Sequence, residues 1–242
     1  MNFQLDSTPY MKELHHIFKS SPLSYSKSSD IDANLRQYFD RAVSIFNSED
    51  FYTSACMFKA LIEKCIEHLN HIDDKDGVIG HLIFEVFNYY GGALQQIETD
   101  LDKKHFYKDY IDFYVVEDFG FSHELVKILF AVATQQDNYL FERALQEKIV
   151  KKMPNYDRDK VLELFILLYD MTSDDAKYFD ICKKFPPQSY ERYIYAATKY
   201  ENLGKFDKAV EILEEGIRIS TYHKDLLEKK YTELKNRILG LA

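Results

Sequence analysis

Hydrophobic residues recur at every third or fourth position along most of this chain, which is the spacing of one face of an α-helix. The pattern is clearest between residues 190 and 220, where two apolar stripes are separated by Gly204. The first stripe is Tyr193, Ala196, Ala197 and Tyr200, and the second is Phe206, Ala209, Val210, Leu213, Gly216 and Ile217. This segment therefore predicts two antiparallel helices joined by a tight turn, with small residues where the two backbones meet.

The same spacing continues through the rest of the chain, interrupted by polar, glycine or proline positions. It predicts further helices at about 8–20, 30–46, 51–69, 78–101, 103–117, 122–134, 137–152, 157–171, 173–185 and 223–241. No segment shows the sustained period of two that is typical of strands. We therefore predict an all-α protein in which short connections place successive helices antiparallel to one another.

The breaks in the pattern also predict how the chain is organised. Residues 1–29 read as a short helix followed by a serine-rich linker, and residues 30–242 read as a single helical domain. A secondary boundary is expected near 118–122. The last helix, 223–241, is apolar on one face only, which is typical of a helix that caps the end of a stack.

The 190–220 segment resembles a tetratricopeptide repeat (TPR). An aromatic residue opens the first helix, a glycine followed by an aromatic residue two positions later makes the turn, and an alanine follows. Residues 30–70 have a similar pattern without the turn glycine, and whether they form a true repeat is left open. The resemblance implies antiparallel helix pairs stacked as a TPR-like α-solenoid with a C-terminal capping helix.

The same resemblance implies a non-enzymatic protein–protein interaction module or scaffold. In stacked pairs of this kind, the first helix of each pair lines the concave surface, and here that places Glu191, Ile194, Thr198 and Glu201 toward a groove. Two acids beside an apolar residue favour a protein or peptide partner with basic residues flanking an apolar anchor. The alternative is that a neighbouring helix or solvent fills this groove.

Composition narrows the classes of partner and the compartment. The chain is 46% hydrophobic with a net charge of −9 and no long run of basic residues, so we expect no nucleic-acid partner. No apolar run reaches the length of a membrane span, and the first residues lack the pattern of a secretory signal. Three cysteines without paired spacing favour a reduced, cytoplasmic protein.

A second resemblance covers residues 174–220. This stretch is similar to the helical C-terminal region of SWIM zinc-finger proteins, with its short helix, small linker and terminal helix pair. The chain has no Cys-x-Cys motif and no matching Cys-x-His motif, so the zinc finger itself is missing. The resemblance implies the helical part of such a protein only.

One cluster of metal-ligand residue types stands near a helix end. Cys65, His68 and His71 are spaced by three residues and are followed by Asp73 and Asp74. Because Cys65 continues an apolar stripe, we interpret the cluster as a helix end. We therefore expect no metal site and no cofactor.

The alternative function is enzymatic. Arg218 and His223 match the Arg-φ-x-x-x-His motif of HEPN-type ribonucleases, which are all-helical. That resemblance implies a ribonuclease in which these two residues act on the scissile phosphate. A charge preference at the end of the preceding helix also explains Arg218, so the interaction module remains our main prediction.

Overall fold

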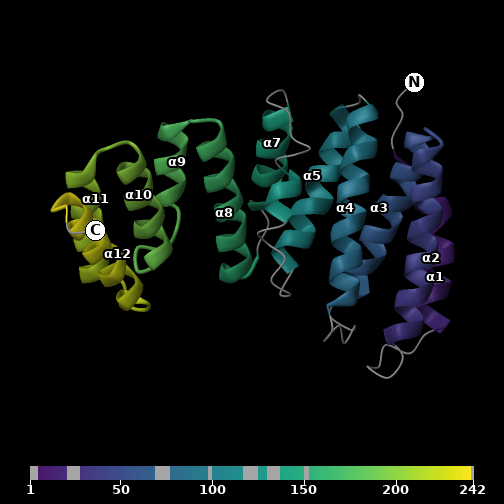
Figure 1. Ribbon diagram of the computed structural model, residues 1–242, viewed down its shortest axis with the longest axis horizontal. Helices are drawn as coiled ribbons and strands as arrows, with labels where there is room; N and C mark the ends of the chain where they lie inside the picture. Colours follow the sequence, from purple (N-terminus) through teal and green to yellow (C-terminus); the bar gives the residue numbers. More distant parts are fainter. Residues whose placement is uncertain are drawn as a thin grey trace. The chain divides into compact units, whose positions relative to one another are not determined.

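The computed structural model describes residues 5–20, 28–68, 77–97, 100–116, 125–129, 137–149 and 153–240. Every regular element within these ranges is a helix (Figure 1). The predicted all-α class is therefore confirmed. Within the same ranges, no helix is both long enough and apolar enough to span a membrane.

The chain divides into two compact units, Met1–Lys151 and Lys152–Ala242. Our predicted secondary boundary near 118–122 lies outside the described residues. The helices of the first unit are α1 (Thr8–Ser20), α2 (Ser28–Asn47), α3 (Phe51–His68), α4 (Val78–Gln96), α5 (Asp100–Val116) and α7 (Asn138–Ile149), and residues 125–129 are also helical. Helix α3 contacts α1, α2, α4 and α5, so it forms the centre of this unit.

The N-terminal helix belongs to the first unit rather than to a separate segment. Leu14 and Phe18, four positions apart on α1, are both buried, and α1 packs against α3. The Phe18 ring stacks on the His68 ring with their centroids 4.5 Å apart. The apolar face of α1 is therefore part of the core of the first unit.

The second unit consists of α8 (Asn155–Met171), α9 (Asp175–Cys182), α10 (Tyr190–Asn202), α11 (Phe206–Ile219) and α12 (Lys224–Ile238). Each of these helices packs against the next one in the sequence, and α12 also reaches α10 (Figure 1). The two helices predicted around Gly204 are α10 and α11, so that prediction is confirmed. The expected stacking into a TPR-like solenoid remains a proposal.

Three helix pairs are joined by turns with the same backbone conformation. Each turn contains one residue in the left-handed region, at Glu49 (φ 68°), Ser173 (φ 55°) and Gly204 (φ 68°). In each turn, the residue that follows the left-handed one donates its backbone N–H to the carbonyl five positions before it. The left-handed residue donates its own N–H to the carbonyl three positions before it. The N···O distances of these two bonds are 3.3 and 3.0 Å after α2, 3.0 and 3.1 Å after α8, and 2.8 and 2.9 Å after α10.

Glycine at the two non-glycine turns should stabilise the protein. A left-handed conformation costs an ordinary residue roughly 1–2 kcal/mol, and the greater freedom of glycine in the unfolded chain offsets about half of that gain. We expect Glu49→Gly and Ser173→Gly each to raise the free energy of unfolding by about 0.5–1 kcal/mol. We expect Gly204→Ala to lower it by a similar amount. Urea titration of the three variants checks the signs, and a loss at either new glycine would contradict them.

The last helix covers less apolar surface than the sequence suggested. Leu227 and Leu234 of α12 are buried against α10 and α11, and Tyr231 is half-buried there. Ile238 is exposed, and Leu241 lies outside the described residues. The C-terminal helix therefore closes the end of this unit through its first three turns.

Candidate functional site

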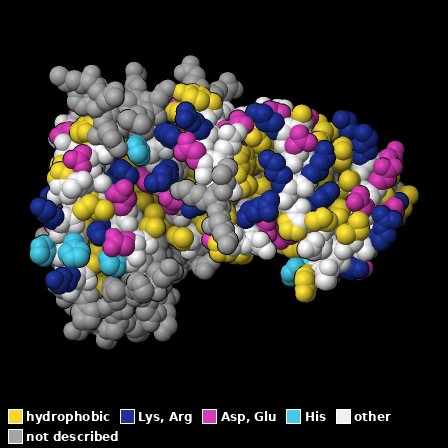
Figure 2. Space-filling view, turned by 180° about the vertical axis from the view of Figure 1, so that it is seen from behind, with side chains coloured by type: hydrophobic (Ala, Val, Ile, Leu, Met, Phe, Trp, Pro, Cys, Tyr) yellow, Lys and Arg dark blue, Asp and Glu magenta, His cyan; other side chains and the backbone are white. Residues whose placement is uncertain are grey.

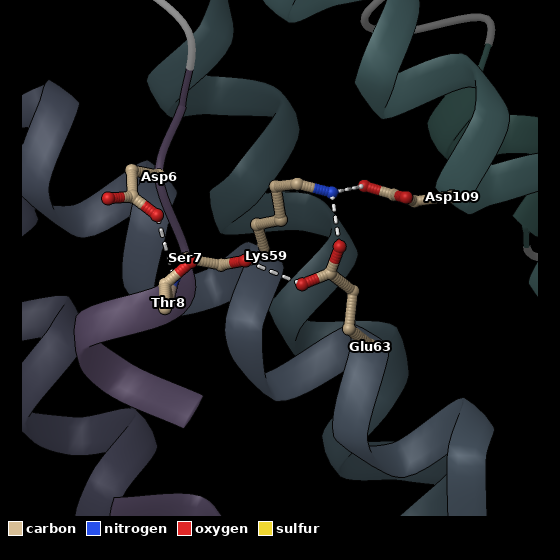
Figure 3. Close-up of polar contacts among 6 residues, drawn as sticks. All are labelled: Asp6, Ser7, Thr8, Lys59, Glu63 and Asp109. Atoms are coloured by element: carbon tan, nitrogen blue, oxygen red, sulfur yellow. Dashed lines mark hydrogen bonds and ion pairs between the residues drawn. The ribbon is translucent and has the colours of Figure 1, made fainter. Parts of the chain in front are cut away.

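The first candidate is a buried group of charges in the first unit. Lys59 of α3 lies between two carboxylates, with its Nζ 2.6 Å from Glu63 and 2.9 Å from Asp109 of α5 (Figure 3). The side chains of Lys59 and Asp109 are each only 8% exposed. The Ser7 hydroxyl donates to the other Glu63 oxygen at 2.7 Å, so the group also holds the segment before α1.

Burial and ion pairing shift the pKa values of Asp109 and Lys59 in opposite directions. Burial raises the pKa of Asp109 to about 6, and the Lys59 ammonium opposes that rise without cancelling it. Burial alone would lower the pKa of Lys59, but Asp109 and Glu63 outweigh burial and raise that pKa. Lys59 is therefore a permanent cation at neutral pH, and Asp109 is a carboxylate whose ionisation is costly.

Perturbed pKa values in a cleft are a common sign of an active site. A polar cleft of about 500 Å³ does lie beside this group, lined by Ser7, Lys59, Glu63, His105 and Lys108 among others. However, a Lys59 held protonated by two carboxylates is neither a base nor a nucleophile, and Asp109 is not among the lining residues. We therefore interpret the group as a tie between α3, α5 and the N-terminal segment.

Because the pKa of Asp109 is raised, the difference in unfolding free energy between the wild type and Asp109→Asn should depend on pH. The folded state binds the Asp109 proton more tightly than the unfolded state does, because the pKa rises from 3.8 to about 6. The wild type should therefore gain stability relative to Asp109→Asn as the pH falls from about 7 to about 4, by on the order of 2 kcal/mol. Urea unfolding of both proteins at several pH values gives this difference. A difference that does not change with pH would mean that Asp109 keeps its ordinary pKa.

The second candidate is a cleft in the second unit, formed by α9, α10, α11 and the residue that follows α9, and it is called here the α9–α11 cleft. Its volume is about 190 Å³. The apolar part of its lining is Phe179, Tyr193, Ala196, Tyr200 and Ile212, and the charged part is Lys183, Arg192 and Glu215. The Phe179 and Tyr200 rings stack with centroids 4.4 Å apart, which fixes one wall.

Cys182 also lines the α9–α11 cleft, but it is not set up as a nucleophile. The side chain is buried, and burial raises the pKa of its thiol to about 12. The thiolate is the reactive form of cysteine, and almost none is present at neutral pH. The cleft is therefore suited to binding rather than to thiol chemistry.

The residues predicted to face a groove do not share one open surface. Glu201 is 6% exposed on its side chain and is bound by Lys230 at 2.7 Å and by Arg237, both from α12. Ile194 packs against the buried cluster that α10 forms with α11 and α12. Helix α12 covers this part of α10, which is the alternative that the sequence had left open. Our expectation that Glu201 faces a partner is thus corrected.

The other two predicted residues remain at the surface. Glu191 and Thr198 are half-buried, and the Ser189 hydroxyl donates a hydrogen bond to the Glu191 carboxylate. Glu191 follows the N-terminus of α10 directly, where a negative charge is favourable. None of the four predicted residues lines the α9–α11 cleft.

The metal-ligand residue types near the end of α3 are only partly described. Cys65 is fully buried with the pKa of its thiol raised to about 12 by burial, and His68 stacks on Phe18. His71, Asp73 and Asp74 lie outside the described residues. In the part of the chain that the structure describes, no group of three or more His, Cys, Asp or Glu side chains is placed to hold a metal ion.

Arg218 and His223, the pair of the alternative ribonuclease motif, are both exposed. Arg218 lies in the last turn of α11, and His223 precedes α12 with a positive φ of 56°. The His223 ring lies 4.9 Å from the Tyr190 ring. Neither residue lines the α9–α11 cleft.

Sequence reasoning missed the α9–α11 cleft as a site. The stripe of α10 predicts that Tyr193, Ala196 and Tyr200 pack inward on their own pair. The structure places Tyr193 and Tyr200 in or against the buried cluster of α10, α11 and α12, and all three residues also line the cleft. Phe179 of α9 was not singled out from the sequence. Phe179 and Ala196 lie on different helices, with Pro186 and Pro187 between them, so no local spacing indicates that they share a cleft.

No protein-family model matches this chain, and no curated protein or solved structure matches it either. Function must therefore be argued from the surface itself. The face of the second unit in Figure 2 has exposed hydrophobic side chains next to Lys, Arg, Asp and Glu side chains.

Proposed function

We propose that this protein is a non-enzymatic interaction module that binds a peptide segment of a partner protein in the α9–α11 cleft. The observation that carries the proposal is an open, largely apolar cleft between three helices, with charged side chains at its edge. Binding clefts for segments of this size combine apolar walls with a few polar groups that fix orientation. An apolar anchor side chain in such a cleft supplies most of the affinity.

The repeated turns support the same proposal. The pairs α8–α9 and α10–α11 share one turn geometry and follow each other directly, as helix pairs in repeat proteins do. Proteins of that architecture present surfaces made by neighbouring repeats, and the α9–α11 cleft joins helices of both pairs. We include the TPR-like stacking of these pairs in the proposal.

A random heptapeptide library displayed on phage tests this function directly. We expect enrichment of clones that share an apolar position and that bind the wild-type protein as synthetic peptides. Ala196→Leu places a larger side chain in the cleft and should abolish that binding. Arg158→Gln, an exposed change on α8 at a residue that does not line the cleft, is the matched control and should bind like wild type.

Melting curves of both variants show whether they are folded. An Ala196→Leu protein that melts near the wild-type temperature and still binds every enriched peptide would place the binding surface elsewhere. Failure to enrich any peptide on the folded wild type would count against the proposed function itself.

A further inference from the structure

Three charged side chains line the α9–α11 cleft, and one of them, Lys183, pairs with Asp180 at 3.1 Å. The other two, Arg192 of α10 and Glu215 of α11, have opposite signs, and within the described residues they do not form an ion pair with each other. Among the described residues, no carboxylate lies within 4.0 Å of the Arg192 guanidinium. The guanidinium donates a hydrogen bond to the Lys183 carbonyl at 3.4 Å, and its central carbon lies 5.8 Å from the centroid of the Tyr193 ring.

These contacts hold Arg192 in place but leave its main binding capacity unused. A guanidinium carries five N–H donors and pairs best with a carboxylate through two parallel hydrogen bonds. The Tyr193 ring and the Lys183 carbonyl orient it at low cost in side-chain freedom. Arg192 is half-buried, so a carboxylate that reaches it would be partly shielded from solvent.

The size of the cleft limits what can lie beside that carboxylate. An enclosed apolar cavity of roughly 150 Å³ is large enough for benzene. The α9–α11 cleft, at about 190 Å³, therefore accepts one aromatic or branched aliphatic side chain. The stacked Phe179 and Tyr200 rings offer a flat wall to such a side chain, and Ala196 leaves room for it.

Glu215 indicates which kind of peptide segment can place both an anchor side chain in the cleft and a carboxylate on Arg192. As a carboxylate it can only accept hydrogen bonds, and backbone N–H groups are the donors that every peptide supplies. A chain that passes through the cleft presents N–H groups on both sides of its anchor residue. A chain that ends at its anchor residue supplies such N–H groups on one side of that residue only, so it offers Glu215 fewer donors.

We infer that the partner segment is internal to its chain, that it inserts an aromatic or branched aliphatic side chain into the α9–α11 cleft, and that it places a neighbouring Asp or Glu carboxylate on Arg192. This inference rests on the proposed function and specifies the ligand of the same cleft. It also revises the basic partner expected from the sequence, because one of the two acids on which that expectation relied, Glu201, is paired with Lys230 and Arg237 of α12.

The test uses blocked hexapeptides and NMR titration of the labelled full-length protein. The probes are acetyl-Gly-Ser-Phe-Asp-Ser-Gly-amide, the matching peptides with Asn or Lys in place of Asp, one with Ala in place of Phe, and acetyl-Gly-Ser-Phe with a free carboxylate. We expect the Phe-Asp peptide to bind more tightly than the Phe-Asn peptide by about tenfold, since a hydrogen bond between two charged groups is stronger than one to a neutral amide. The Ala-Asp peptide should bind much more weakly than the Phe-Asp peptide.

Variants of the cleft separate the roles of the two charges. Arg192→Gln should remove the preference for Asp over Asn while leaving the affinity for the Phe-Asn peptide unchanged, and Arg192→Glu should make the Phe-Lys peptide the preferred ligand. Glu215→Gln should weaken all the Phe peptides by the same factor, because the backbone N–H it binds is common to them. Arg158→Gln again serves as the control.

Each result bears on one of the two proposals. Equal affinity of wild type for the Phe-Asp and Phe-Asn peptides, or equal losses for both in Arg192→Gln, would overturn the role of Arg192 while leaving a peptide-binding cleft. Tighter binding of the peptide with a free carboxylate would overturn the internal segment. If peptides enriched from the library bind but no Phe peptide does, the anchor is wrong. Absence of any peptide binding would refute the proposed function as well.

Discussion

Lys59→Met should lower the free energy of unfolding by about 3–5 kcal/mol at a pH near 8. The substitution keeps the length of the side chain but leaves the Asp109 carboxylate, 8% exposed, without its cation. An unpaired buried charge is far more costly than a missing pair. Because Asp109 takes up a proton more readily once Lys59 is absent, the loss should become smaller at a pH of about 5. Chemical unfolding at both pH values measures the effect.

Two further variants separate this effect from a general loss of charge. Arg143→Met removes an exposed pair with Glu147, 3.3 Å apart on α7, and should cost less than about 0.5 kcal/mol. The double change Lys59→Met with Asp109→Leu removes both buried charges and should recover most of the stability. If Lys59→Met costs no more than Arg143→Met, the buried group contributes nothing to the fold.

Gly216→Ala should destabilise the second unit by about 1–3 kcal/mol. A Cβ at this position would lie 2.6 Å from Cγ of Tyr193, much closer than the 3.5–4.0 Å at which carbon atoms pack. Tyr193 cannot withdraw easily, because its ring is buried and its hydroxyl donates to the Pro187 carbonyl at 2.7 Å. This clash outweighs the gain of roughly 1 kcal/mol that alanine normally brings to a helix.

Gly92 of α4 provides the control, since it is also a glycine inside a helix. A Cβ there would meet the Phe46 ring at 3.6 Å, an ordinary contact. Gly92→Ala should therefore stabilise the protein by about 0.5–1 kcal/mol, opposite in sign to Gly216→Ala. Thermal melts of the two variants show whether their changes in stability have opposite signs. Two changes of the same sign would show that helix propensity, rather than the approach of α10 to α11, governs both positions.

The periodic pattern of the sequence was sufficient to predict the all-α class and the helix pair around Gly204, but it carried the helix that begins at Val78 to 101, whereas α4 ends at Gln96 and α5 begins at Asp100. The stripe of α10 and the turn at Gly204 lie where the spacing placed them, because local hydrogen bonding and one buried face determine both. Contacts between residues far apart in the sequence could not be predicted from this periodicity. Nothing near Lys59 in the sequence indicates that Asp109, fifty residues later, lies beside it. The pair becomes apparent only when α3 and α5 pack together.

The residues of the α9–α11 cleft could not be predicted from the sequence for the same reason, since contacts between different helices decide which of them are exposed. Predicting the exposed face of α10 required knowing which helices cover it, and α12 turned out to cover the part around Glu201. Arg192 was not singled out from the sequence, since one arginine on a helix looks like any solvated charge. Its importance depends on a spatial fact: among the described residues, no carboxylate lies within 4.0 Å of its guanidinium.

The shared turn geometry has a consequence for how this protein is compared with others. One of the three turns contains glycine, while Glu49 and Ser173 adopt the same left-handed conformation without it. A profile that weights a conserved turn glycine would register the pair α10–α11 and pass over α2–α3 and α8–α9. Backbone comparison of single helix pairs would register all three turns alike, because it depends on the φ angle and the two hydrogen bonds that they share.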